Sequence, residues 1–213
     1  MAISFPKVYP ILDSSFIPAV GRATFLNGLG ARLAAAGVSL LEYRNKTGPD
    51  MEILADAAIL RAALPGPNIK LILDDRVDLI DRTGFDGVHV DAGDLSAAEA
   101  RSLLGPEKIV GAFGGSTEFL PGTLSGPADY LAIGPVFATT TKQTSVTPIG
   151  IEGVRRMRKL AGPKRVLTAA GGVTLPTASA VIAAGASAVA VSAAIFGADD
   201  PASEFRRWVK EIG

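Results

Sequence analysis

The chain contains no cysteine and only one histidine, His89, among its 213 residues. The absence of cysteine excludes disulfide bonds and thiolate chemistry and is compatible with a reducing compartment. A single histidine excludes metal sites built from several imidazoles. No apolar run is long enough to span a bilayer, and the N-terminus lacks a signal-peptide pattern, so we expect a cytoplasmic protein.

Net charge is also missing. The 21 lysines and arginines balance the 21 aspartates and glutamates, which gives a formal net charge of zero. A neutral chain gives no support to a nucleic-acid or membrane-surface partner, and we expect neither. Hydrophobic residues make up 48% of the sequence, so the chain is expected to fold as one globular domain over residues 1–213.

Short apolar segments alternate with helical patterns along the whole chain. The segments expected to form strands are 8–12, 39–43, 69–73, 87–90, 108–112, 129–133, 166–169 and 188–191. Amphipathic or capped segments follow them, among them a weak helix after Ser116 and a final helix from Asp200. Eight short, even units predict an α/β fold with a single (β/α)8 barrel; the alternative is a doubly wound open sheet.

A basic group, Arg155, Arg156, Arg158 and Lys159, falls on one of these predicted helices. On the outer ring of a barrel, such a group is expected to form a solvated face and not an anion-binding site.

Active sites of (β/α)8 barrels lie at the carboxyl ends of the strands, so the residues after each strand are informative. After the second strand, alternation places Glu42, Arg44 and Lys46 on one side of the chain. The polar or small residues that follow the other strands are Asp74, Asp75, Asp94, Thr139, Thr141, Lys142, Gly171, Gly172, Ser192 and Ala193.

Two charge groups emerge from this arrangement. Asp75 and Asp94 follow adjacent strands and predict a shared hard cation such as Mg²⁺, although each taken singly is equally typical of a helix N-cap. Arg44, Lys46 and Lys142 predict a polyanion beside that cation, because unpaired buried cations are costly. The loops after strands seven and eight are the usual phosphate site of such barrels. The site is therefore expected to hold a metal-bound polyphosphate and a simple phosphate.

These motifs resemble the thiamine phosphate synthase family over most of the chain. The pieces that carry the resemblance are Glu42-Tyr-Arg44-Asn-Lys46, Asp74-Asp75, Gly87-Val-His89-Val with Asp94, the loop Gly134–Lys142, and Gly171-Gly172.

The resemblance implies a Mg²⁺-dependent transferase of thiamine biosynthesis. Enzymes of this family join a hydroxymethylpyrimidine diphosphate to a thiazole phosphate and release pyrophosphate. By resemblance, Asp75 and Asp94 hold Mg²⁺, and Arg44, Lys46 and Lys142 bind the diphosphate. The remaining substrate-binding positions would be Glu42, Asp74, Thr139, Thr141, Gly171, Gly172, Ser192 and Ala193. The resemblance is also compatible with a homodimer.

The chain departs from the family pattern at several positions. Glu42 and Asp74 stand where neutral amides are usual, and we expect the charge of Glu42 to repel a diphosphate. A serine-bearing segment after strand five is replaced by Ala112-Phe113-Gly114-Gly115. Three alternatives stay open at this point: a diverged paralogue that binds a phosphorylated ligand without turnover, a thiazole tautomerase-like isomerase, and a Schiff-base aldolase that uses Lys142.

Overall fold

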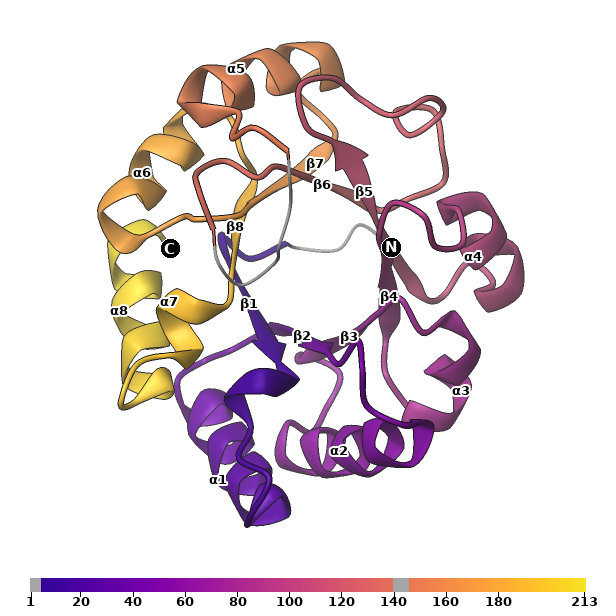
Figure 1. Cartoon of the computed structure of the whole chain (residues 1–213), viewed down its shortest axis with the longest axis vertical. Coiled ribbons are helices and arrows are strands. Elements are labelled where there is room, and N and C mark those ends of the chain that lie inside the picture. The colour runs from indigo at the N-terminus through magenta and orange to yellow at the C-terminus, as the bar shows by residue number, and fades with distance from the viewer. Residues whose placement is uncertain (1–4, 140–145) are drawn as a thin grey trace.

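The computed structural model describes residues 5–139 and 146–213. Eight parallel strands form a closed barrel in which every strand pairs with its neighbours in chain order, and β8 pairs with β1. Helices surround the strands on the outside (Figure 1). The predicted (β/α)8 barrel is therefore confirmed, and the open-sheet alternative is wrong.

The strands correspond to the predicted apolar segments to within a few residues. Their bounds are β1 Val8–Asp13, β2 Leu40–Arg44, β3 Lys70–Asp74, β4 Gly87–Val90, β5 Ile109–Gly115, β6 Tyr130–Ile133, β7 Val166–Ala170 and β8 Ala188–Val191.

The helices are α1 Arg22–Ala35, α2 Asp50–Ala63, α3 Ile80–Thr83, α4 Ala97–Leu104, α5 Gly150–Ala161, α6 Leu175–Ala183, α7 Ala193–Phe196 and α8 Pro201–Ile212, with short 3₁₀ turns at Ser14–Phe16 and Val77–Leu79. A capping box formed by Ser96 and Glu99 starts α4, and the Asp200 side chain caps α8. Within the described residues, none of these helices has the length and apolarity needed to cross a membrane.

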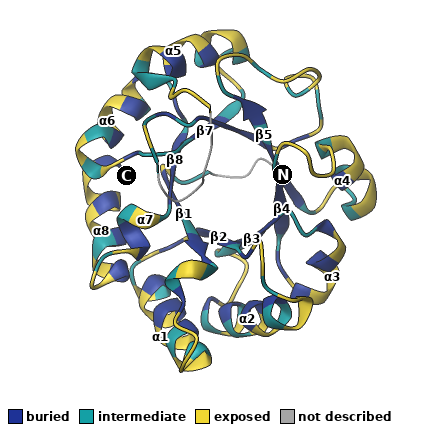
Figure 2. Cartoon of the chain, in the orientation of Figure 1, coloured by how far each residue is buried: buried dark blue, intermediate teal, exposed yellow. Residues whose placement is uncertain are grey.

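Alternation along the strands divides the core into two layers. One set of side chains packs between the strands and the helices, where Figure 2 shows the inward faces of the helices as buried and their outer faces as exposed. The other set fills the barrel interior and includes Tyr9, Leu40, Ile72, Ile109 and Tyr130. A filled interior means that a ligand has room only at an end of the barrel, above this inner layer.

The weak helix predicted after Ser116 is absent. Residues 116–129, between β5 and β6, form turns and bends, because Pro121, Gly122 and Gly126 do not sustain a helix. This crossover is held instead by Arg165, which precedes β7. Its guanidinium donates to the carbonyl oxygens of Ala128 at 2.9 Å, Thr123 at 3.0 Å, Leu124 at 2.9 Å and Gly126 at 3.0 Å.

The predicted solvated face on α5 is only partly correct. Arg155 and Arg156 are exposed, but Arg158 is half-buried and donates to the carbonyl oxygens of Gly185 and Gly162, both at 2.6 Å, and of Arg165 at 2.8 Å. Arginine side chains thus tie loops together at the end of the barrel where the strands begin.

We expect Arg165→Ala to lower the free energy of unfolding by about 2 kcal/mol, because several charge-assisted hydrogen bonds to backbone carbonyls are lost. Urea denaturation measures the change. Arg165→Lys is the control: it keeps the charge but loses the planar fork, and should recover only part of the stability. An unchanged urea midpoint in Arg165→Ala would contradict the proposed role of this side chain.

Candidate active site

A cavity of about 400 Å³ opens at the carboxyl ends of the strands. Residues from all eight strands and from the loops that follow them line it. Its volume lies in the range occupied by small-molecule ligands. The polar residues that follow the strands in the sequence therefore surround one common space, as the barrel prediction requires.

Most of the predicted site residues line this cavity: Glu42, Arg44, Asp74, Thr139, Gly171, Gly172, Ser192 and Ala193. Lys46 and Asp75 lie beside the cavity. The Lys46 ammonium forms ion pairs with Asp75 and with Asp74, which lines the cavity. Thr141 and Lys142 fall outside the described residues, so their predicted roles stay predictions.

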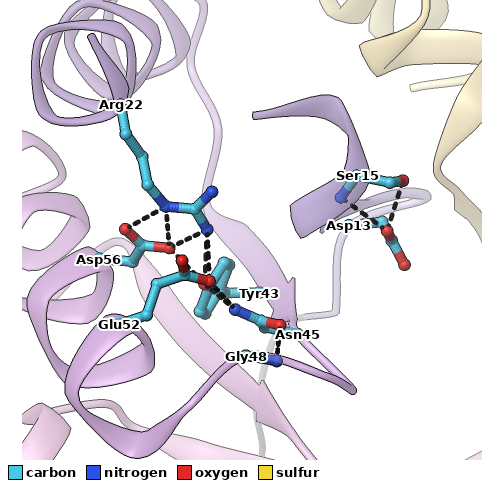
Figure 3. A network of polar contacts seen from close by, with 8 residues as sticks. All are labelled: Asp13, Ser15, Arg22, Tyr43, Asn45, Gly48, Glu52 and Asp56. Carbon is cyan, nitrogen blue, oxygen red and sulfur yellow. Dashed lines mark hydrogen bonds and ion pairs between the residues drawn. The ribbon is translucent and has the colours of Figure 1, made fainter. Parts of the chain in front are cut away.

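Arg44 ends β2 between two carboxylates. Its guanidinium pairs with Asp13 at the end of β1, and its Nε lies 3.3 Å from Asp74 Oδ2. Asp13 also accepts hydrogen bonds from the Ser15 backbone N–H at 3.0 Å and hydroxyl at 2.6 Å (Figure 3). Burial raises the pKa of Asp13, but the Ser15 hydrogen bonds and Arg44 outweigh it, and the net pKa is below its usual value. Asp13 is a site residue that the sequence analysis missed, although it ends an apolar strand just as Asp74 does.

Lys46 lies among carboxylates from the loops after β3 and β4. Its Nζ pairs with Asp75, and it lies 3.2 Å from Asp74 Oδ2 and 3.8 Å from Asp91 Oδ2. The buried Asp74 Oδ2 has ion-pair distances to Lys46 and Arg44 but no contact with hydrogen-bond geometry. Burial raises the pKa of Asp74, against the lowering effect of the Lys46 and Arg44 charges. Of the three cations predicted to bind an anion, the two that the structure describes, Arg44 and Lys46, are thus already compensated by carboxylates.

Asp75 has a left-handed backbone, with φ 60°, which is uncommon for a residue that carries a side chain. Its N–H donates to the His89 carbonyl oxygen at 2.8 Å, and its Oδ1 accepts from the Asp91 N–H at 3.1 Å. These bonds fix Asp75 against the end of β4.

Asp94 lies in the exposed turn after β4, where its N–H donates to the Asp91 carbonyl oxygen at 3.3 Å. Neither predicted metal ligand caps a helix, since Ser96 caps α4 and Arg76 precedes the 3₁₀ turn after β3. Throughout residues 5–139 and 146–213, no three acidic or histidine side chains are grouped so as to hold a metal ion. The Mg²⁺ shared by Asp75 and Asp94 stays a prediction.

Glu42 lies at the floor of the cavity and is 3% exposed. It accepts a hydrogen bond from the Tyr9 hydroxyl, which lies 2.7 Å from the Tyr130 hydroxyl. The Tyr130 hydroxyl in turn lies 3.2 Å from His89 Nδ1. Gly111 leaves room for the Tyr130 ring, because a Cβ there would lie 2.0 Å from the ring carbon Cζ. A chain of four polar side chains therefore crosses the barrel from β2 to β4, and sequence reasoning found only its two ends.

Burial raises the pKa of Glu42 to about 8, and the charge of Asp74 adds to the rise, whereas Tyr9 and Arg44 lower it. Glu42 is therefore mostly uncharged at neutral pH. The raised pKa weighs against the expectation that Glu42 repels a diphosphate, which assumed an ionised carboxylate and stays a prediction.

Gly171 and Gly172 follow β7 with φ 87° and 67°. A Cβ on Gly172 would lie 2.3 Å from the Ala138 carbonyl oxygen, so only glycine lets the loops after β6 and β7 pack this closely. Ser192, after β8, lines the same part of the cavity, and its buried hydroxyl has no hydrogen-bond partner among the described residues. This hydroxyl is therefore available to a ligand.

Known proteins resemble this chain in both sequence and fold. A sequence profile of the thiamine monophosphate synthase family matches residues 8–195. The thiamine-phosphate synthase of Koribacter versatilis is 43% identical over 192 residues, which cover 90% of this chain and 89% of that protein. The enzyme of Agrobacterium fabrum is 41% identical over 176 residues, 80% of each chain. The structure of thiamine phosphate pyrophosphorylase from Pyrococcus furiosus superposes with a TM-score of 0.80 at 28% identity, covering 97% of this chain and 96% of that one.

The raised pKa of Glu42 predicts a pH-dependent stability. Stabilisation by the protonated Glu42 is fully present below the unfolded-state pKa near 4.5 and is lost as pH rises through the folded-state pKa of about 8. Glu42→Gln does not titrate. Between pH 5 and pH 9 the variant should therefore gain roughly 4 kcal/mol relative to the parent chain. Chemical denaturation at several pH values measures this gain, and parallel curves for the two proteins would show that Glu42 is ionised throughout.

Proposed function

The chain belongs to the thiamine monophosphate synthase family, and we propose that it joins hydroxymethylpyrimidine diphosphate to a thiazole phosphate with release of pyrophosphate. One observation carries the proposal: a single cavity has Arg44, with Lys46 beside it, on one side and the Gly171-Gly172 turn with the Ser192 hydroxyl on another. In such a cavity the positive charges can bind a diphosphate, and the glycine turn and the serine hydroxyl can donate hydrogen bonds to a second phosphate.

The reaction needs no protein nucleophile. The bond between the pyrimidine methylene carbon and the diphosphate oxygen breaks, and pyrophosphate leaves with the electron pair. The thiazole nitrogen donates its lone pair to the same carbon and forms the new C–N bond. Arg44 and Lys46, with Lys142, would stabilise the charge that develops on the leaving group. The loops after β7 and β8 would orient the thiazole through its phosphate.

The charges around Arg44 and Lys46 favour an added metal ion. These two cations face four carboxylates, Asp13 and Asp74 with Asp75 and Asp91, so the described part of this site has an excess of acidic groups. A diphosphate adds further negative charge.

Aspartate oxygens suit Mg²⁺, which takes one or two carboxylates and fills its other positions with phosphate and water. Asp75 and Asp94 would hold the ion, which supplies charge neutralisation for the diphosphate when bound. The lack of a three-ligand cluster in the described residues is compatible with this sparse mode of binding.

An assay of pyrophosphate release with both precursors tests the proposed activity. We expect turnover only when both are present, and we expect Lys142→Ala to lower kcat by about 10²-fold, the scale of losing one group that stabilises the transition state. Lys142→Arg, which keeps the charge, is the control and should retain more activity. Binding of both precursors without pyrophosphate release would identify a ligand-binding paralogue instead of an enzyme.

Metal dependence is tested separately by binding. Pyrophosphate affinity, measured by calorimetry, should fall when Mg²⁺ is chelated and recover when it is restored. Asp94→Asn should weaken Mg²⁺-dependent pyrophosphate binding, because one of two metal ligands loses its charge. Asp81→Asn, an exposed aspartate on α3, is the matched control. Equal affinities with and without Mg²⁺ would remove the metal from the proposal.

A further inference from the structure

The outer face of β2 carries a second polar network, distinct from the cavity. Alternation turns Glu42 and Arg44 toward the barrel interior, whereas Tyr43 and Asn45 face α1 and α2. Five side chains meet there, namely Arg22 of α1, Glu52 and Asp56 of α2, Tyr43, and Asn45 (Figure 3). None of the five lines the cavity.

The five side chains form a closed ring. Arg22 Nε lies 2.9 and 3.0 Å from the two oxygens of Asp56, which is 2% exposed. Tyr43 donates its hydroxyl proton to Asp56, so its oxygen is free to accept from Asn45 Nδ2 at 3.1 Å. Asn45 Nδ2 also donates to Glu52 Oε1 at 2.8 Å, and Arg22 Nη2 lies 3.3 Å from that same oxygen. The ring is only partly buried, since the Arg22 and Glu52 side chains are 19% and 38% exposed, but members that satisfy one another still stiffen it.

Asn45 connects this ring to the turn that carries Lys46. Its side-chain oxygen accepts from the Gly48 N–H at 2.8 Å, so both ends of its amide are engaged. Gly48 is closely packed against it: a Cβ there would lie 2.4 Å from Asn45 Nδ2 and 2.6 Å from Glu52 Oε1. The backbone on both sides of Lys46 is thereby anchored to α2.

We propose that Asn45 is a positioning residue for the diphosphate half of the site, acting through the turn 45–48 to set where the Lys46 nitrogen lies. The inference rests on the proposed function for the identity of the anion. A lysine side chain has four rotatable carbon bonds and loses considerable entropy when it is ordered. Ordering the backbone of turn 45–48 costs further entropy, and the ring removes this backbone cost before the ligand arrives, which is the basis of preorganised charge stabilisation.

The rival explanation is that the ring only stabilises the barrel. Stability alone would affect the two halves of the cavity together, because loosening of β2 disturbs the whole barrel mouth. Positioning of Lys46 would affect the diphosphate half and leave the loops after β7 and β8 unchanged. The two substrates therefore separate the explanations.

The test uses Asn45→Ala and Gly48→Ala. The first removes the side chain that accepts from the Gly48 N–H, the second places a methyl group against that side chain, and neither removes a charge. With Mg²⁺ present, each should weaken pyrophosphate binding by about tenfold in calorimetry and raise KM for the pyrimidine diphosphate by a similar factor. KM for the thiazole phosphate should change less than twofold. Arg165→Ala is the matched control, because it loosens the opposite end of the barrel and should leave pyrophosphate affinity unchanged.

Unchanged pyrophosphate affinity in a folded variant, or an equal rise of both KM values, would overturn the inference. If Asn45→Ala does not fold, Gly48→Ala gives the same readout. If the parent chain shows no turnover but its pyrophosphate affinity still falls in the variants, the proposed function fails and the positioning role stands. A parent chain that does not bind pyrophosphate would refute both.

Discussion

The carboxylate of Asp74 holds the cationic part of this site together. Its Oδ2 lies within ion-pair distance of Arg44 and Lys46, and its side chain is only 4% exposed. A buried charge of this kind is tolerated because two cations face it, and the cations in turn need it to offset their own desolvation. Asp13, at the end of β1, pairs with Arg44, and Asp75, just after β3, pairs with Lys46. The end of β2 therefore has a fixed electrostatic structure before any ligand binds.

The barrel and most of the site follow from local sequence patterns. Each strand shows as a short apolar segment, and a closed parallel barrel then places every strand end on one rim. That topology is why residues as distant in sequence as Glu42 and Ser192 could be assigned to one cavity. The prediction of a helix after Ser116 was wrong, because turn-forming residues in this segment outweigh its weak periodic pattern. The short helix α7 carries too few residues to show a period at all.

The remaining site features depend on distances that a sequence does not encode locally. Tyr9 and Tyr130 read as ordinary core residues, and only the stagger of the strands brings their hydroxyls to 2.7 Å. From the sequence, Glu42 is expected to be a charged residue that contacts substrate. Its burial at the floor of the cavity raises its pKa and leaves it mostly neutral near pH 7. The ring around Asn45 likewise joins three elements across the outside of β2. Burial and tertiary contacts, more than residue type, decide the chemistry of these groups.

Because carboxylates already pair with Arg44 and Lys46, an anion can bind these cations only in exchange for the carboxylates. Asp13 and Asp74 form ion pairs with Arg44, and Asp74 also forms one with Lys46. A polyanion bound at these cations would displace the internal counter-ions and gain only the difference between two sets of contacts. After its departure the same carboxylates would pair with the cations again. Exchange of this kind would limit how tightly any single anion is held, which suits the proposed release of a highly charged product.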